Sequence, residues 1–249
     1  MYRPRRSGDL RRAFTFGGRI PPVLGALLAL ILVATVGSWI LRDAGWAALS
    51  PEALRRGELW RLVSWVLVQD DPLNLLFGGF VLYSFGAQLI YGWGESRFFW
   101  TFVGLTLAGA VATLLVALAW PPFWGFQHVG MWPVVDGLLL LWALRYPDQQ
   151  MSFWGVLPMT GRTLVLLLVG GTVLYGLFLG GVHGLPRMTP HFGALLAAWI
   201  ASRGTFSLPF RRWRLQWRDY WLERQLRRRS RHLKVVKKDG HNEPPTWMN

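Results

Sequence analysis

Four side chains that could take part in acid–base chemistry or metal binding lie in or beside apolar stretches of this chain: Asp136, His128, His183 and His191. An aspartate inside a membrane helix costs about 2.5–3.5 kcal/mol to insert, so Asp136 needs a partner or water. Two interpretations stay open: a structural acid paired with His191 or His128, or an acid at work in a hydrated cavity. His191 without a nucleophile cannot carry out triad chemistry, which favours a structural histidine.

The same four side chains do not follow a known metal-binding pattern. The spacing lacks HExxH and every comparable ligand motif. The chain also has no cysteine, which excludes disulfides, thiol catalysis and cysteine-based metal sites. We therefore predict no metal and no cofactor.

The elements that must position these side chains are apolar segments. A bilayer core about 30 Å thick needs roughly 20 apolar residues per helix, and fewer where a helix is short or buried in protein. We predict an all-α integral membrane protein with six transmembrane helices, at residues 20–41, 73–91, 98–120, 131–144, 163–181 and 190–202. The fourth and sixth are short, and the fourth contains Asp136. Together they form a membrane domain at residues 20–203.

The distribution of basic residues orients this bundle. Of 27 Lys and Arg, six lie in residues 1–19 and thirteen in residues 203–238, which leaves eight for the 183 residues between. The positive-inside rule places both basic ends in the cytoplasm, as an even number of helices requires. The first apolar run is too long for a signal peptide and lacks a cleavage site. We expect the bacterial inner membrane as the location.

The basic ends also predict a partner. Residues 204–238 read as an amphipathic helix in which Trp213, Trp217 and Trp221 share one face, with Arg227, Arg228 and Arg229 among the surrounding basic residues. Such a helix lies in the headgroup layer and is attracted to anionic lipid. This placement favours a lipid surface over nucleic acid as the partner. Residues 1–19 form a basic N-terminus, and residues 239–249 read as disordered.

Five segments in sequence order carry a resemblance. Residues 57–62 read GELWRL with Trp60 and Arg61, and residues 93–98 read WGESRF with Trp93 and Gly94. Between them, Asn74 and Gly78 stand at the spacing of an H-x-x-x-N pattern. Residues 151–155 read MSFWG and residues 190–194 read PHFGA. In this order and at this spacing the chain resembles the rhomboid superfamily over about residues 50–203.

The resemblance implies a six-helix bundle whose short fourth helix begins partway into the membrane, below a loop that enters the bundle. In the family that helix begins with the nucleophilic serine of G-x-S-G, and a histidine of the sixth helix is the base. On this alignment Trp132 stands at the serine and Pro133 at the following glycine. Asn74 replaces the second-helix histidine, and Gly78 replaces its asparagine. His191 alone remains of the dyad, so no catalytic site is intact.

Other serines do not supply the nucleophile on this alignment. Residues 121–158 contain no Ser or Thr except Ser152, which is expected at the cytoplasmic entrance of the fifth helix. Pro133 suits the first turn of a helix and removes an N–H near the family's oxyanion hole. Small residues at four-residue spacing, including Gly104 and Gly193, are expected to permit close helix packing. In the rhomboid family, small residues of the sixth helix pack on the fourth.

The functional prediction follows from these departures. Asn74 in place of histidine and the MSFWG segment resemble the derlins, a pseudoprotease branch of the superfamily. We predict a catalytically inactive rhomboid-like protein that binds transmembrane segments of client membrane proteins in trafficking or quality control. The alternative is an active rhomboid serine protease. A small transporter is disfavoured because Asp136 is the only acid within a predicted span.

Overall fold

The computed structural model describes residues 20–153, 157–181 and 184–203. Six longer helices stand at the predicted places, namely α2 (Pro22–Leu41), α5 (Pro72–Trp93), α6 (Glu95–Ala119), α7 (Trp132–Arg145), α8 (Gly161–Phe178) and α9 (Thr189–Ser202). The predicted tail helix with Trp213, Trp217, Trp221, Arg227, Arg228 and Arg229 lies outside the described residues, as do His183 and both predicted terminal segments.

Four of these helices, α2, α5, α6 and α8, are long and apolar enough to cross a membrane. The chain is therefore an integral membrane protein of mainly helical structure. At 1.5 Å per residue, the 14 residues of α7 and of α9 each extend about 21 Å, short of a full bilayer core. The crossing by six helices stays a prediction.

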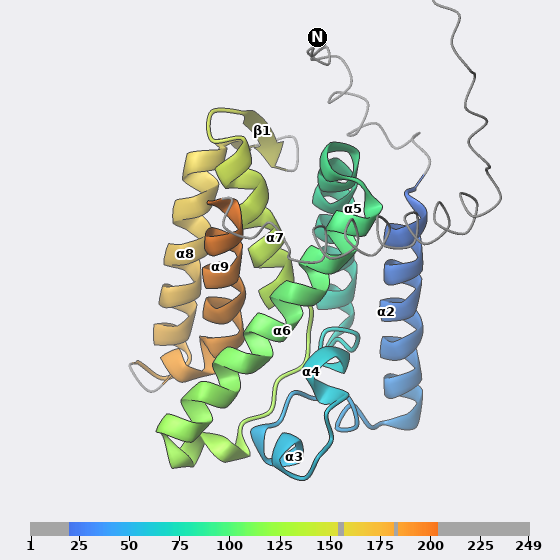
Figure 1. Cartoon of the computed structure of the whole chain (residues 1–249), viewed down its shortest axis with the longest axis vertical. Helices are drawn as coiled ribbons and strands as arrows, with labels where there is room; N and C mark the ends of the chain where they lie inside the picture. Colours follow the sequence, from blue (N-terminus) through green and yellow to red (C-terminus); the bar gives the residue numbers. More distant parts are fainter. Residues whose placement is uncertain (1–19, 154–156, 182–183, 204–249) are drawn as a thin grey trace, which may run out of the picture. The chain divides into compact units, whose positions relative to one another are not determined.

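Short elements connect the helices. The segment between α2 and α5 holds α3 (Pro51–Arg55) and α4 (Arg61–Ser64), and η1 (Pro121–Gly125) follows α6. We call the end of the bundle with α3 and α4 the loop end. The opposite end carries a two-stranded antiparallel sheet, β1 (Gln150–Phe153) and β2 (Leu157–Thr160), in the register Gln150↔Thr160 (Figure 1). This hairpin is an addition to the predicted all-α fold. The turn η3 (Leu185–Met188) leads into α9.

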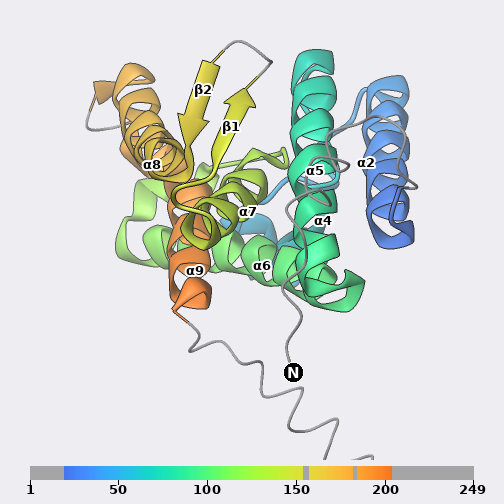
Figure 2. The same ribbon diagram turned by 90° about the horizontal axis from the view of Figure 1, so that it is seen from above.

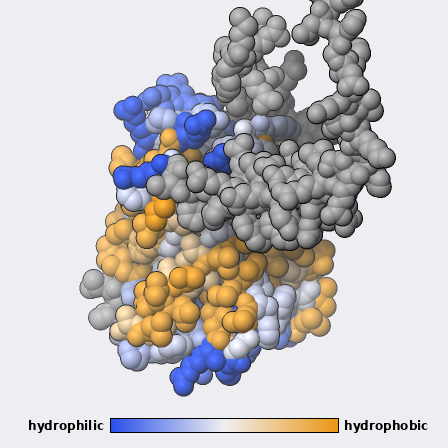
Figure 3. All heavy atoms as spheres, viewed as in Figure 1, coloured by the Kyte–Doolittle hydropathy of each residue, from blue (hydrophilic) through white to orange (hydrophobic). Residues whose placement is uncertain are grey.

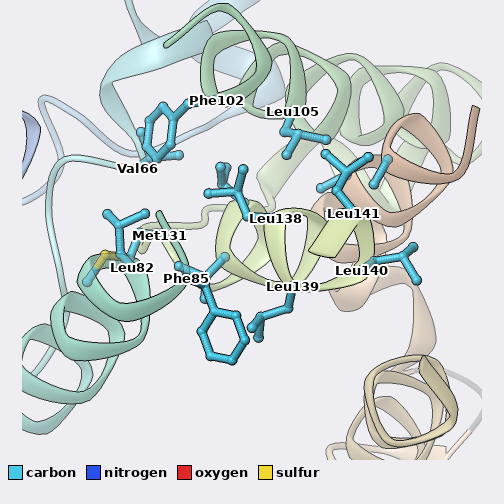
Figure 4. Packing of buried hydrophobic residues seen from close by; sticks show 14 of the residues in the cluster. Val66, Leu82, Phe85, Phe102, Leu105, Met131, Leu138, Leu139, Leu140 and Leu141 are labelled. Carbon is cyan, nitrogen blue, oxygen red and sulfur yellow. The ribbon is translucent and has the colours of Figure 1, made fainter. Parts of the chain in front are cut away.

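Helix α7 is the centre of the packing. It contacts α5, α6, α8 and α9, and Figure 2 shows it between α5 and α8. Leu138–Leu141 of α7 meet Leu82 and Phe85 of α5 and Phe102 and Leu105 of α6 (Figure 4). A buried polar contact joins α7 to α5, where the indole Nε1 of Trp142 donates to Oε1 of Gln88 over 2.9 Å. Such a satisfied polar pair fixes one rotational setting of the two helices.

The outward faces of the other helices are apolar. The helices α2 and α8 bury little of their surface, and α2 exposes Leu30, Leu32, Val33, Val36, Ile40 and Leu41. On the face shown in Figure 3, hydrophobic residues occupy a broad middle zone, with hydrophilic residues toward both ends. An exposed apolar zone of this extent suits lipid and not water.

Close packing of α9 on α6 confirms the expected role of Gly193 and corrects its partner. A Cβ at Gly193 would lie 2.6 Å from the carbonyl oxygen of Ala108 and 2.6 Å from the Cβ of Ala112, both on α6. The rhomboid resemblance implied contact with the fourth helix instead. That contact is made by the next residue, because a Cβ at Gly137 of α7 would lie 3.3 Å from the carbonyl oxygen of Ala194. Gly104, by contrast, has open space around it.

Candidate functional site

The segment before α7 returns into the bundle as extended chain (Figure 1). Leu49 and His128 exchange backbone hydrogen bonds of 2.8 and 3.0 Å, and the amide of Gly130 donates to the carbonyl of Trp65 over 2.9 Å. Gly130 has φ +120°, a conformation that side chains rarely adopt. These bonds satisfy the backbone below the loop end and start α7 inside the bundle, as the rhomboid resemblance implies.

A side chain from the loop caps this start. Met131, the residue before α7, donates its amide to Oε1 of Gln69 over 3.1 Å, and the Gln69 amide nitrogen donates to the carbonyl of Val66. Gln69 is fully buried. Sequence reasoning did not identify Gln69. The only signal in the sequence is that a polar residue precedes Asp70 and Asp71, of which Asp71 caps α5. Pro133 stands in the first turn of α7, as predicted.

One face of α7 stays accessible. From Met131 to Ala143 every residue is buried except Trp132 and Asp136, which are half-buried. They stand four residues apart and therefore on the same side of the helix, one turn from each other. Both are predicted site residues. The structure thus gathers them on a single accessible stripe, which we call the α7 face.

The first contact of the α7 face is with α5. The indole Nε1 of Trp132 donates a hydrogen bond to Oδ1 of Asn74 over 3.0 Å. Asn74 is held in turn, because its Nδ2 lies 2.7 Å from Oδ1 of Asp70 and 2.7 Å from Oδ2 of Asp71. Both the oxygen and the nitrogen of the Asn74 side-chain amide are therefore hydrogen-bonded. The position assigned to the nucleophile is filled by an indole bound to the position assigned to the family histidine.

Gly78 lies one turn further along α5. A Cβ at Gly78 would lie 2.6 Å from the Cε of Met131. The glycine thus makes room for the residue that precedes Trp132, and its departure from the family asparagine has a packing reason. Three departures from the rhomboid pattern, at Trp132, Asn74 and Gly78, fit one another in space.

The second contact of the α7 face is with α9. Oδ2 of Asp136 lies 2.7 Å from Nδ1 of His191, and the two side chains are 14% and 15% exposed. Of the two partners considered for Asp136, the structure selects His191. The other carboxylate oxygen, Oδ1, accepts no hydrogen bond from the described residues and is not buried. Asp136 is therefore a paired acid with one accessible oxygen.

His128 is not a partner of Asp136. Its ring packs edge-on against Trp65 and against His191, with centroid distances of 5.5 and 6.0 Å. Its Nε2 is buried without a hydrogen-bond partner among the described residues. Burial, and second the nearby His191, lower the pKa of His128 to about 3. His128 lies between α6 and α7, outside both helices, and is a neutral ring at physiological pH.

The hydroxyl groups of the described residues bind elsewhere than His191. In this part of the chain no serine hydroxyl hydrogen-bonds to His191; the hydroxyl of Ser64 donates to the carbonyl of Ala47 and that of Ser202 to the carbonyl of Trp199. Nor do three or more His, Cys, Asp or Glu side chains gather as a metal site among these residues. The α7 face offers an indole and a carboxylate oxygen, and His191 of α9 adds an imidazole beside them; these groups can bind a partner.

The motif residues of the loop have structural roles. The Arg61 side chain binds Glu58 at 2.6 Å and donates to the carbonyls of Gly45 and Ala48. The indole of Trp60 donates to the carbonyl of Trp46 over 3.1 Å. Trp60 and Arg61 thus act as a clamp that holds the loop together.

The second motif makes a turn. Gly94, with φ +87°, separates α5 from α6, and the Arg97 guanidinium lies over the Trp93 ring, 5.0 Å from its centroid. The left-handed conformation explains the glycine, and the cation–π contact holds the start of α6 to the end of α5.

Comparisons with known proteins identify a matching family and similar proteins. The model of a family described as "Eukaryotic integral membrane protein (DUF1751)" matches residues 25–203. The chain is 28% identical over 163 residues to Derlin-1 of Oryza sativa subsp. japonica, which covers 63% of this chain and 64% of the relative. It is 27% identical over 179 residues to Derlin-1 of Arabidopsis thaliana, covering 65% and 60%.

These matches bear on two predictions. The similarity to Derlin-1 supports the derlin-like features expected from Asn74 and residues 151–155. The matched region spans less than two thirds of the length of either relative. The matching family is described as eukaryotic, which argues against the bacterial inner membrane expected from the sequence. The family description does agree with the expected location in a membrane.

Proposed function

The chain belongs to the family of eukaryotic integral membrane proteins (DUF1751), and from this premise we propose that it is a rhomboid-like, derlin-like protein without protease activity. Its function is to bind transmembrane segments of client membrane proteins for trafficking or quality control. The observation that carries the proposal is the α7 face. The rhomboid resemblance assigns a nucleophilic serine to this position, whereas the α7 face carries Trp132 and Asp136.

The neighbouring helices support access to this face from the side. In α5, residues 72–80 are exposed or half-buried except for Gly78, whereas residues 81–90 contain no exposed residue. The loop-end half of α5 therefore packs loosely, and the other half is held in the core. Beyond α7, α8 exposes apolar side chains along its length, including Leu166, Leu174 and Phe178. A client helix can pack on such a surface without displacing the core.

Position-specific crosslinking tests client binding. A photoreactive phenylalanine analogue would replace Trp132, or Leu73 of α5, which is 63% exposed, or Val33 of α2, which is 68% exposed. After irradiation in native membranes, positions 132 and 73 should capture membrane proteins through their transmembrane segments. Val33 serves as a lipid-facing control of similar exposure. Equal capture at all three positions would show only random encounters in the bilayer and would contradict the proposal.

A separate experiment tests the absence of protease activity. The purified protein would be treated with a serine-directed fluorophosphonate and with a generic rhomboid substrate. We expect neither labelling nor cleavage, since serine needs a nearby base to act as a nucleophile. Labelling that a single Ser→Ala substitution abolishes would overturn this part of the proposal in favour of the active protease.

A further inference from the structure

Asp136 has no other charged residue near it along α7. The helix carries this one acid and no basic residue before Arg145 at its end. Oδ2 is bound to His191, and Oδ1 is accessible and without a partner among the described residues. The ring of His128 packs edge-on against that of His191, and burial keeps His128 neutral. The carboxylate of Asp136 therefore keeps one oxygen free to bind a further group.

A carboxylate oxygen without a partner inside the bundle favours a particular kind of ligand. In a low-dielectric environment an accessible carboxylate interacts strongly with a cation. Placing a lysine or arginine in a transmembrane segment costs free energy, and this cost falls when the side chain pairs with an acid on another helix. Their long apolar stems allow the charged group to reach a carboxylate that lies below the helix surface.

The second residue of the α7 face fits the same partner. Trp132 is one helical turn from Asp136 and, like it, half-buried. An indole ring attracts ammonium and guanidinium groups through its π face, more strongly when the site is desolvated. The indole N–H is already bound to Asn74, which fixes the ring position. An aromatic ring and a carboxylate one turn apart on the same side of a helix are groups that can both contact one cation.

Resting on the client binding proposed above, we infer that the α7 face recognises transmembrane segments that carry a lysine or arginine in their apolar stretch. The basic group pairs with Oδ1 of Asp136 and lies beside the ring of Trp132. His191 acts here as a positioning residue that orients the carboxylate.

Binding of designed helices to the full-length protein tests this inference. The chain has no cysteine, so Leu73→Cys creates a single site for a donor fluorophore. The probes are Leu/Ala transmembrane peptides with an acceptor and with Lys, Leu or Glu at one central position, in phosphatidylcholine vesicles. Energy transfer then gives the affinity of each peptide. We expect the Lys peptide to bind about tenfold more tightly than the Leu peptide, and the Glu peptide more weakly than both.

Matched variants separate the possible outcomes. Asp136→Asn keeps the shape of the side chain and should bring the Lys and Leu peptides to within about twofold of each other. Glu95→Gln at the start of α6 removes the same charge from the other end of the bundle and should leave the tenfold preference. Equal binding of all three peptides to the unsubstituted face would overturn this inference and leave client binding intact. No energy transfer with any peptide would count against client binding itself.

Discussion

The indole Nε1 of Trp132 and the side-chain oxygen of Asn74 are joined by a 3.0 Å hydrogen bond. The rhomboid resemblance assigns these two positions to the nucleophile and to a histidine of the second helix. In this chain they bind each other and tie the loop end of α5 to the start of α7. The two side chains that depart from the rhomboid pattern at these positions thus make a structural contact with each other.

A double-mutant cycle measures that contact. Trp132→Phe removes the donor and part of the ring, and Asn74→Ala removes the acceptor. We expect a coupling free energy of about 1 kcal/mol, the usual net contribution of one such hydrogen bond. The measurement is unfolding in mixed detergent micelles followed by circular dichroism. As a control, Trp132→Phe combined with Leu76→Ala should be additive, because Leu76 is exposed on α5. A coupling near zero for the first pair would show that the bond contributes nothing.

Asp136 and His191 should depend on each other for stability. Removing one partner of a buried pair typically costs about 3–5 kcal/mol, and the partial exposure of this pair places His191→Leu at the lower end. Replacing both by leucine leaves no unpaired charge and should recover most of the loss. The same unfolding assay compares the three variants. A double variant no more stable than His191→Leu would contradict the pairing.

Packing of α9 on α6 should be sensitive to the size of residue 193. Gly193→Val places methyl groups against the Ala108 carbonyl and Ala112, and we expect a loss of about 1–3 kcal/mol or more. The matched control is Gly104→Ala on α6, where nothing lies within 4 Å. That change should be neutral or stabilise the helix by up to about 1 kcal/mol. Similar destabilisation at both positions would disprove the close contact.

Arg61 should not be replaceable by lysine. Its guanidinium reaches Glu58 and two backbone carbonyls at once, a geometry that an ammonium group cannot reproduce. We expect Arg61→Lys to loosen the loop between α2 and α5, seen as faster proteolysis of residues 42–60. Arg56→Lys provides the comparison, because Arg56 meets the same Glu58 but is largely exposed. Equal protease resistance of both variants would rule out the clamp.

The six longer helices were predictable because each lies in a long, mainly apolar stretch of the sequence. The predicted 20–41 and 131–144 became Pro22–Leu41 and Trp132–Arg145, with differences of one or two residues. The helices α3 and α4 were not predicted, since elements of four or five residues depend on local caps such as the Ser50 hydroxyl that accepts from Ala53. The hairpin of β1 and β2 lacks any strong alternating pattern.

The sequence predicted which residues belong to the site, but not which of them contact each other. Trp132, Asn74, Asp136 and His191 were identified as site residues, but nothing in the sequence says which rotation of α7 faces which neighbour. For that reason Asp136 had two candidate partners, and the pairing of Trp132 with Asn74 was not foreseen. Gln88 was open to prediction, because a lone amide within an apolar helix needs a buried partner, which proved to be Trp142.

His128 makes stability dependent on pH in a definite direction. Its pKa is lowered to about 3 in the folded protein, against about 6.5 in the unfolded chain. The unfolded state therefore binds more protons between these values, and folding stability falls as pH decreases from about 6.5 toward 3. The contribution of this one group approaches about 1.4 kcal/mol per pH unit within that window. His128→Phe keeps an aromatic ring against Trp65 and removes the proton.

Comparing the two proteins isolates this effect from the carboxylates, which titrate in both. Unfolding free energies would be measured from pH 7.5 to pH 4.5 in the same micelles. We expect the difference in stability between His128→Phe and the parent protein to grow in favour of the variant as pH falls below about 6.5. Parallel curves over this range would mean that His128 is protonated equally in both states, and hence that its Nε2 is not kept from water as the structure places it.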